Sequence, residues 1–179
     1  MMGWRFKGAN QLQNDTLDIV NRMLSNGKAG LLDININQPM KAMETGTYLD
    51  ELHDYSMLLF EGVPLQNQKL DDLKALILAE TTKLGRGEFS DDLLPAVLAN
   101  KKLQFYKSLD SNQKRVSMMV DAFVNDKPWA DVTQQIERQE KLTKQDIIDF
   151  ARRHLRTDNY ACVYKQMGTD TTLKKIEKP

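Results

Sequence analysis

The hydrophobic periodicity of the chain changes at Pro64, and this change limits the possible folds more than any other feature. Before it, the two-residue alternation of a half-buried strand runs through Met2–Lys7, and strand-like runs follow at about Ala42–Leu49 and Tyr55–Val63. After it, apolar residues recur at helical spacing as far as Leu155. This order predicts an α+β domain, in which a mostly antiparallel sheet packs against a helical block.

Two exceptions complete this pattern. The spacing of Leu17–Leu24 predicts a helix before the hairpin, with Asp15 as its cap and Gly27 as its stop. A second short helix is predicted over Leu31–Ile36. Near the end of the chain, Tyr160–Lys165 alternates again, which predicts one strand that returns to the sheet.

The block after Pro64 predicts five helices. They are Leu70–Leu84, a helix capped by Ser90, Val116–Phe123, Trp129–Ile136, and a helix that begins at a capping box of Thr143 and Asp146 and ends near Leu155. We expect their apolar stripes to form the core. Because both faces of Tyr55–Val63 are largely apolar, that strand is predicted to be covered on both sides.

Composition excludes several classes of protein. Lys and Arg number 25, as do Asp and Glu, so there is no basic field to hold nucleic acid or an anionic membrane surface. The single cysteine rules out an internal disulfide and a thiolate zinc site. The longest apolar run, Ala75–Ala79, is too short to cross a bilayer, and Met1–Lys7 has no signal-peptide pattern behind it. We therefore expect a soluble protein without nucleic-acid or membrane partners, in the cytoplasm or the periplasm.

The residues that most often carry chemistry are isolated here. His53 and His154 lie far apart in the sequence, so neither H-E-x-x-H nor H-x-x-E-H is present. His53 is predicted to be a solvated turn residue, and His154 to interact with the end of its own helix. Cys162 is predicted to be a buried, inert thiol, and Arg152–Arg156 a solvated helix end. We assign no catalytic and no metal-binding residue, and the substrate-binding residues stay open.

The order of several short motifs is more specific than any one of them. In sequence these are Met2-Gly3-Trp4-Arg5-Phe6, Asp15-Thr16-Leu17-Asp18-Ile19-Val20, Leu24–Leu32, the Leu70–Leu84 helix, Gly87–Leu93 and Leu142–Ala151. This succession resembles the repeated domain of the pitrilysin/insulinase-type zinc metallopeptidases, the inverted zincins. The resemblance extends to about Gln166.

The resemblance implies a role without bond chemistry. Such proteases pair homologous α+β domains into two halves around a peptide substrate, and only an upstream domain holds zinc, through H-x-x-E-H and a distal glutamate. This segment has none of these, so it resembles the second, non-catalytic domain, with zinc expected in the parent's catalytic domain and none here. The arginine and tyrosine with which a substrate-binding companion domain contacts its substrate are also missing from Asn35–Thr45. No catalytic or oxyanion residue carries over.

The resemblance also suggests how the segment is organised. Residues 1–166 are predicted to form one α+β domain, and residues 167–179 the start of an interdomain linker. Domains of this family begin with a further strand and helix, which this chain is expected to lack. The strand Met2–Lys7 is then predicted to expose an unpaired edge that could pair with another copy. The expected partners are other domains of the same polypeptide and the parent's peptide or protein substrate.

Two alternatives stay open at this point. Family members that have lost zinc serve as assembly subunits, so the segment could belong to a scaffold without peptidase activity. Without the resemblance, the chain could be an unrelated α+β interaction module that binds a helical partner through the Leu70–Leu84 or Ile147–Leu155 face.

Overall fold

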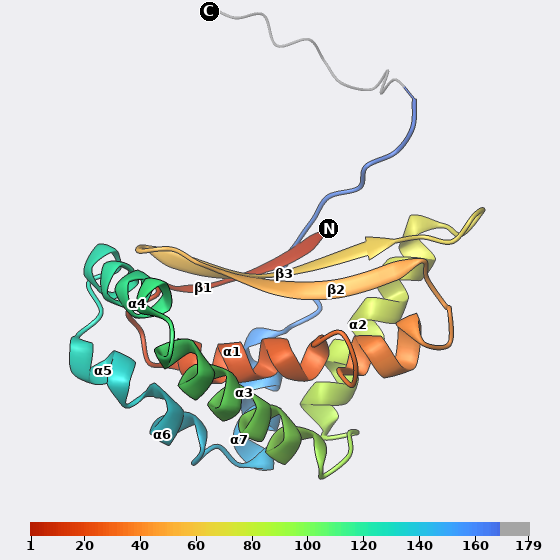
Figure 1. Cartoon of the computed structure of the whole chain (residues 1–179). Helices are drawn as coiled ribbons and strands as arrows, with labels where there is room; N and C mark the ends of the chain where they lie inside the picture. Colours follow the sequence, from red (N-terminus) through yellow and green to blue (C-terminus); the bar gives the residue numbers. More distant parts are fainter. Residues whose placement is uncertain (169–179) are drawn as a thin grey trace, which may run out of the picture.

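The computed structural model describes residues 1–168 and has the predicted α+β class. Four antiparallel strands form one sheet in the order β2-β3-β1-β4, and the helices lie on one side of it (Figure 1). The strands are β1 (Met2–Lys7), β2 (Glu44–Glu51), β3 (Tyr55–Val63) and β4 (Ala161–Cys162). The linker is predicted over residues 167–179, of which 169–179 lie outside the described part of the chain.

Strand β1 is internal to the sheet over its first residues. It pairs with β3 along its whole length, and Met2 and Gly3 pair with β4 on the other side. The prediction that all of Met2–Lys7 is an open edge is therefore wrong, because the returning strand covers its start. Within residues 1–168, Arg5 and Lys7 have no strand on that side, and pairing with another copy there stays a prediction.

The helices keep the predicted order with shifted bounds. They are α1 (Gln13–Leu24), the π-helix η1 (Asp33–Asn37), α2 (Leu70–Arg86), α3 (Leu93–Leu109), α4 (Asn112–Val124), α5 (Trp129–Thr133), α6 (Gln135–Gln139) and α7 (Lys144–His154). Helix α1 begins before Asp15, which lies in its first turn and is bound by Arg138 instead of capping. The single helix predicted over Trp129–Ile136 is divided into α5 and α6 at Gln134.

Two helix ends follow the local signals. The capping box before α7 is present, because Thr143 and Asp146 exchange side-chain and backbone hydrogen bonds. Helix α2 ends at Gly87, whose φ of 73° is the left-handed conformation that glycine adopts without a steric penalty. Both predictions are confirmed. Each signal acts over three or four residues, so the local sequence contains it.

The core lies between the sheet and the helices. Trp4 is 1% exposed, donates its indole N–H to the Arg156 carbonyl at 2.9 Å, and has the rings of Phe60 and Tyr160 at 5.0 Å. The apolar stripes of α2 and α7 are buried in the same core, through Leu73, Ile77, Leu84, Ile147, Ala151 and Leu155. Because these stripes are covered, neither of the two helical docking faces considered from the sequence is available to a partner.

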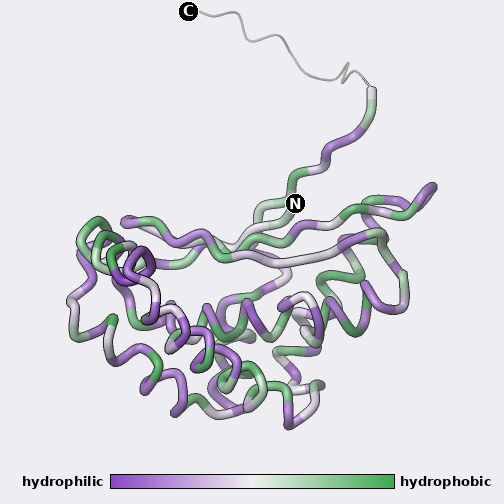
Figure 2. The backbone as a smooth tube through the Cα atoms, viewed as in Figure 1, coloured by the Kyte–Doolittle hydropathy of each residue, from purple (hydrophilic) through white to green (hydrophobic). Residues whose placement is uncertain are grey.

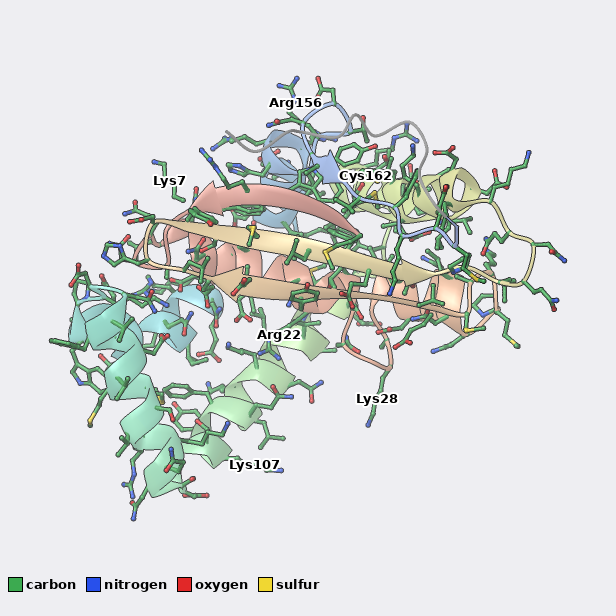
Figure 3. All side chains as sticks on the ribbon, turned by 90° about the horizontal axis from the view of Figure 1, so that it is seen from above. Lys7, Arg22, Lys28, Lys107, Arg156 and Cys162 are labelled. Carbon is green, nitrogen blue, oxygen red and sulfur yellow. The ribbon has the colours of Figure 1, made fainter. Side chains whose placement is uncertain are left out.

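The opposite face of the sheet carries no helix within residues 1–168, as the view onto it in Figure 3 shows. Strand β3 alternates buried residues with Met57 and Leu59, which are half-buried, and with Tyr55 and Val63, which are 39% and 43% exposed. The prediction that this strand is covered on both sides is wrong. The apolar residues of its second face are half-buried or exposed on a sheet surface that carries no helix within residues 1–168.

Helix α4 also departs from the expectation of a buried stripe. Val116, Met119, Val120 and Phe123 share one face at helical spacing, yet each is more than half exposed, and Phe123 is 84% exposed. In Figure 2, green and purple stretches alternate along α4, which lies at the margin of the helical layer. Ala122 is the buried residue of this helix. None of the helices within residues 1–168 combines the length and the hydropathy that a membrane span requires.

Candidate functional site

The two histidines lie on different elements. His53 is in the turn between β2 and β3, and His154 is the last residue of α7. Within residues 1–168, no three His, Cys, Asp or Glu side chains are grouped so that they could hold a metal ion. His154 packs against Phe150 of its own helix and against Phe6, with ring centroids 4.6 Å and 5.6 Å away. Burial, and then the nearby Arg153 charge, lower the pKa of His154.

His53 links the β2–β3 turn to the turn after α4. Its Nδ1 lies 2.8 Å from the Asp54 carboxylate and its Nε2 lies 2.9 Å from that of Asp126. Hydrogen bonds, first to Asp126 and then to Asp54, raise the pKa of His53 above its ordinary value of 6.5. The side chain is solvated, as expected, but the two carboxylates hold the protonated ring in place.

This link should weaken as the pH rises. Since the folded-state pKa of His53 is raised, the interaction is fully present below pH 6.5 and is lost as the pH rises through the raised value. We expect an NMR titration of the His53 ring to give a midpoint above 6.5, and Asp126→Asn to bring it closer to 6.5. Asp158→Asn, at an exposed carboxylate that pairs with Arg156, is the control and should leave the midpoint unchanged. A wild-type midpoint below 6.5 would contradict the assignment.

Of two other candidates, Cys162 differs from expectation and the arginine cluster agrees with it. Cys162 is exposed, so the prediction of a buried thiol is wrong: β4 is only two residues long and lies at the rim of the sheet (Figure 3). Arg152, Arg153 and Arg156 are exposed, as predicted for a solvated helix end. Arg152 also donates to the Gly85 carbonyl at 2.6 Å, which joins α7 to α2, and Arg156 pairs with Asp158 at 2.6 Å.

One concave site in the described part of the chain is a charged cavity of about 330 Å³ between α1, α3, α4, the α5–α6 segment and the end of β2. We call it the charged cavity. Its charged lining residues are Asp15, Asp18, Arg22, Glu51, Lys101, Asp121, Lys127, Asp131 and Arg138. No histidine or cysteine contributes to this lining, so its chemistry is that of ion pairing and hydrogen bonding.

One group in the charged cavity centres on Asp18 of α1. Its carboxylate lies 2.6 Å from the Lys101 ammonium of α3 and 3.0 Å from the Arg22 guanidinium, and its side chain is 14% exposed. Arg22 also donates to Gln104 of α3. Burial alone would raise the pKa of Asp18, but the two cations outweigh it and lower the pKa overall.

A second group lies where β2 ends beside α4. The Lys127 ammonium is 3.7 Å from the Glu51 carboxylate and 3.6 Å from that of Asp121, so one cation serves two carboxylates at long distance. Partial burial is the main cause that raises the pKa of Glu51, and the charges of Asp18 and Asp121 raise it further. Asp121 also accepts a hydrogen bond from the Asn125 amide.

The third group joins α1 to the α5–α6 segment. Asp15 accepts from the Arg138 guanidinium at 2.6 Å and from the Gln135 amide at 3.0 Å. Arg138 also reaches Asp131, through its backbone carbonyl at 2.7 Å and its carboxylate at 3.7 Å. The charged side chains of this group are bonded to one another, and these contacts fix the short helices α5 and α6 against α1.

The charged cavity is not predictable from the sequence patterns as a whole. One signal for it was present: Asp15, Asp18 and Arg22 follow one another at intervals of three and four residues, which places them on one face of α1. Asp18 and Asp15 pair with Lys101 and Arg138, which come about 80 and 120 residues later in the chain, and nothing in the local sequence indicates that pairing.

Comparison with known proteins gives the fold a context. No family model matches the chain. A curated protein, zinc protease PqqE of Helicobacter pylori, is 25% identical over 124 residues, which cover 69% of this chain. The crystal structure of a protease from Helicobacter pylori has a TM-score of 0.83 with 21% identity, over 89% of this chain and 38% of that one.

A second solved structure can be compared with this chain as one domain with another, because the alignment covers most of both chains. It is described as the inactive peptidase domain of a zinc protease from Bordetella parapertussis, and it aligns with a TM-score of 0.74 and 16% identity over 89% of this chain and 88% of that one. The chain has the fold of a pitrilysin-type peptidase domain. The resemblance drawn from the short motifs is thereby confirmed.

A structure that is not described as a protease has the same fold. A chain of Complex III from Candida albicans aligns with a TM-score of 0.70 and 11% identity, over 86% of this chain and 39% of that one. The chain spans 28% of the length of the curated relative that it matches. The activity, substrates and partners of a whole protein of this kind are therefore matters for proposal.

Proposed function

We propose that this segment is a non-catalytic domain of a zinc-dependent metalloendopeptidase. Its role is to pack against the catalytic domain of the same polypeptide and to form part of the wall around a peptide or protein substrate. The observation that supports this most is the alignment over nearly the full length with the inactive peptidase domain from Bordetella parapertussis. Both the cytoplasm and the periplasm fit this role.

The placement of the potential ligands agrees with the proposal. His53 lies in a turn against two aspartates, and His154 lies between aromatic rings, so the two imidazoles serve local packing. Zinc in proteins of this kind needs two histidines on one helix and a carboxylate. The metal is therefore assigned to the parent's catalytic domain, and the contribution of this segment is substrate alignment and exclusion of water.

The test has two parts. The purified chain, equilibrated with Zn²⁺ and then desalted, should retain no stoichiometric zinc by elemental analysis and should cleave no peptide. The parent polypeptide should carry H-x-x-E-H upstream of Met1, and deleting residues 1–168 from it should reduce peptide hydrolysis by about 100-fold or more, the scale associated with lost alignment. Chelator-sensitive proteolysis by the isolated chain would end the proposal.

A scaffold role is the second candidate, and the similarity to a chain of Complex III favours it specifically. In that case the parent would lack H-x-x-E-H and would hydrolyse no peptide. Deletion of residues 1–168 would instead prevent assembly, which size-exclusion chromatography of the parent would detect. The sequence upstream of Met1 separates the two candidates before any assay.

A further inference from the structure

The proposed function gives no role to the charged cavity, although its properties suit a bound molecule. Its volume of about 330 Å³ falls within the range of small-molecule sites. It lies between helices α1, α3, α4, α5 and α6 and the end of β2. The cavity belongs to this chain alone, so a ligand for it can be sought without any other domain.

The charges in the cavity are divided unevenly between two groups. Around Asp18, the cations Arg22 and Lys101 exceed the acids by one charge. Around Lys127, the carboxylates of Glu51 and Asp121 exceed the bases by one charge. The cavity therefore has a positive and a negative pole on the same lining, and a molecule with both charges would complement both.

The geometry at the negative pole shows that its charges are incompletely paired. Lys127 stays 3.6 to 3.7 Å from each carboxylate, whereas Lys101 lies 2.6 Å from Asp18. A shared cation at this distance leaves acceptor positions on Glu51 and Asp121 for further donors. An ammonium group between them would supply such donors and the missing positive charge.

An unsatisfied polar group in the lining gives a second, independent indication. Asn14 lines the cavity and is 3% exposed. Its amide nitrogen donates to the Gly8 carbonyl and to the Ser56 hydroxyl, but its Oδ1 accepts from no partner within residues 1–168. A buried acceptor without a donor is costly, and a ligand N–H that reaches it would remove that cost.

We propose that the charged cavity binds a small zwitterion of the amino-acid or short-peptide class. The ligand carboxylate pairs with Arg22 and Lys101, and the ligand ammonium lies between Glu51 and Asp121. The two remaining acids already face Arg138: Asp15 accepts from Arg138 and Gln135, and the Asp131 carboxylate lies 3.7 Å from the Arg138 guanidinium. The site goes beyond the proposed function and does not depend on it.

The wild-type chain and three dipeptide probes test the proposal. Titration of the ¹⁵N-labelled chain with Ala-Ala should give saturable amide shifts at Asn10 and Gln11 in the cavity lining, with a Kd of about 1 mM. N-acetyl-Ala-Ala lacks the ammonium and Ala-Ala-amide lacks the carboxylate. Each is expected to bind about tenfold more weakly, since each loses one charge-assisted contact.

Two variants assign the poles, and each has a matched control. Glu51→Gln should bind Ala-Ala and N-acetyl-Ala-Ala equally and should still bind Ala-Ala more tightly than Ala-Ala-amide. Arg22→Gln should bind Ala-Ala and Ala-Ala-amide equally and should still bind Ala-Ala more tightly than N-acetyl-Ala-Ala. The controls are Glu137→Gln and Arg153→Gln, both at exposed positions outside the cavity. General damage to the fold would weaken all three probes equally, so the crossed pattern cannot arise from instability.

Three results would overturn the proposal. One is an absence of shifts at the solubility limit of Ala-Ala. The second is equal binding of the free and blocked dipeptides to the wild-type chain, and the third is saturable shifts confined to residues outside the cavity. Each result is independent of zinc content and of peptide hydrolysis, so the proposed function can fail while this site stands, or the reverse.

Discussion

Replacing Trp4 with alanine is expected to lower the free energy of unfolding by about 4 kcal/mol, the usual cost of removing a buried tryptophan. Trp4 contributes three kinds of interaction: complete burial, contacts with the Phe60 and Tyr160 rings, and a hydrogen bond to the Arg156 carbonyl. Its loss leaves a cavity at the centre of β1 and an unpaired carbonyl. Urea denaturation followed by circular dichroism measures the change.

The chain provides its own control for this prediction. Trp129, at the start of α5, is 46% exposed, and Trp129→Ala should cost less than about 1 kcal/mol. Trp4→Phe keeps most of the apolar volume and removes the indole donor, so its cost should lie between the other two. Equal costs for Trp4→Ala and Trp129→Ala would show that β1 is not at the centre of the core.

The second large effect is expected from Asp18→Asn, which should lower the free energy of unfolding by about 3 kcal/mol. The substitution keeps the shape of the side chain and removes its charge. Lys101, with a side chain that is 18% exposed, then faces Arg22 without a counterion. A partly buried cation that loses its partner costs more than the pair contributes when it is intact.

The pH dependence of this effect has a defined sign. Because the pKa of Asp18 is lowered in the folded state, its contribution is fully present above its ordinary value of 3.8 and is lost as the pH falls through the folded-state value. The stability difference between wild type and Asp18→Asn should therefore narrow below about pH 4. Asp91→Asn is the control substitution. The Asp91 carboxylate, which pairs with Lys144, is 89% exposed, and an exposed ion pair contributes little to the free energy of unfolding. A pH-independent difference would contradict the ionic explanation.

The parts of the fold that the sequence predicts well are those with short-range causes. The alternation of Met2–Lys7 and Tyr55–Val63 gives β1 and β3 with their observed bounds. The Thr143–Asp146 capping box sets the start of α7, and Gly87 ends α2. In each case the deciding interaction spans at most a few residues, so the local pattern contains it.

The errors have long-range causes. An apolar stripe on α4 does not reveal whether another layer covers it, and Phe123 is exposed because none of the described elements packs there. The second apolar face of β3 gives the same ambiguity. The charged cavity depends on pairs such as Asp18–Lys101 and Asp15–Arg138, whose members are joined only by the tertiary fold. Hydrophobic periodicity shows which face of a helix or strand tends to be buried. Whether that face is buried depends on the elements that pack against it in the fold.

The pairing of Met1 with Val163 has a consequence for biosynthesis. The Met1 nitrogen donates to the Val163 carbonyl and the Val163 N–H donates to the Met1 carbonyl, both at 2.9 Å, so the first and the last parts of the described chain meet in one ladder. During translation, β1 must wait for some 160 further residues to leave the ribosome before β4 can join it. The nascent domain therefore completes its sheet late, and this interval is when chaperones would have most opportunity to engage it.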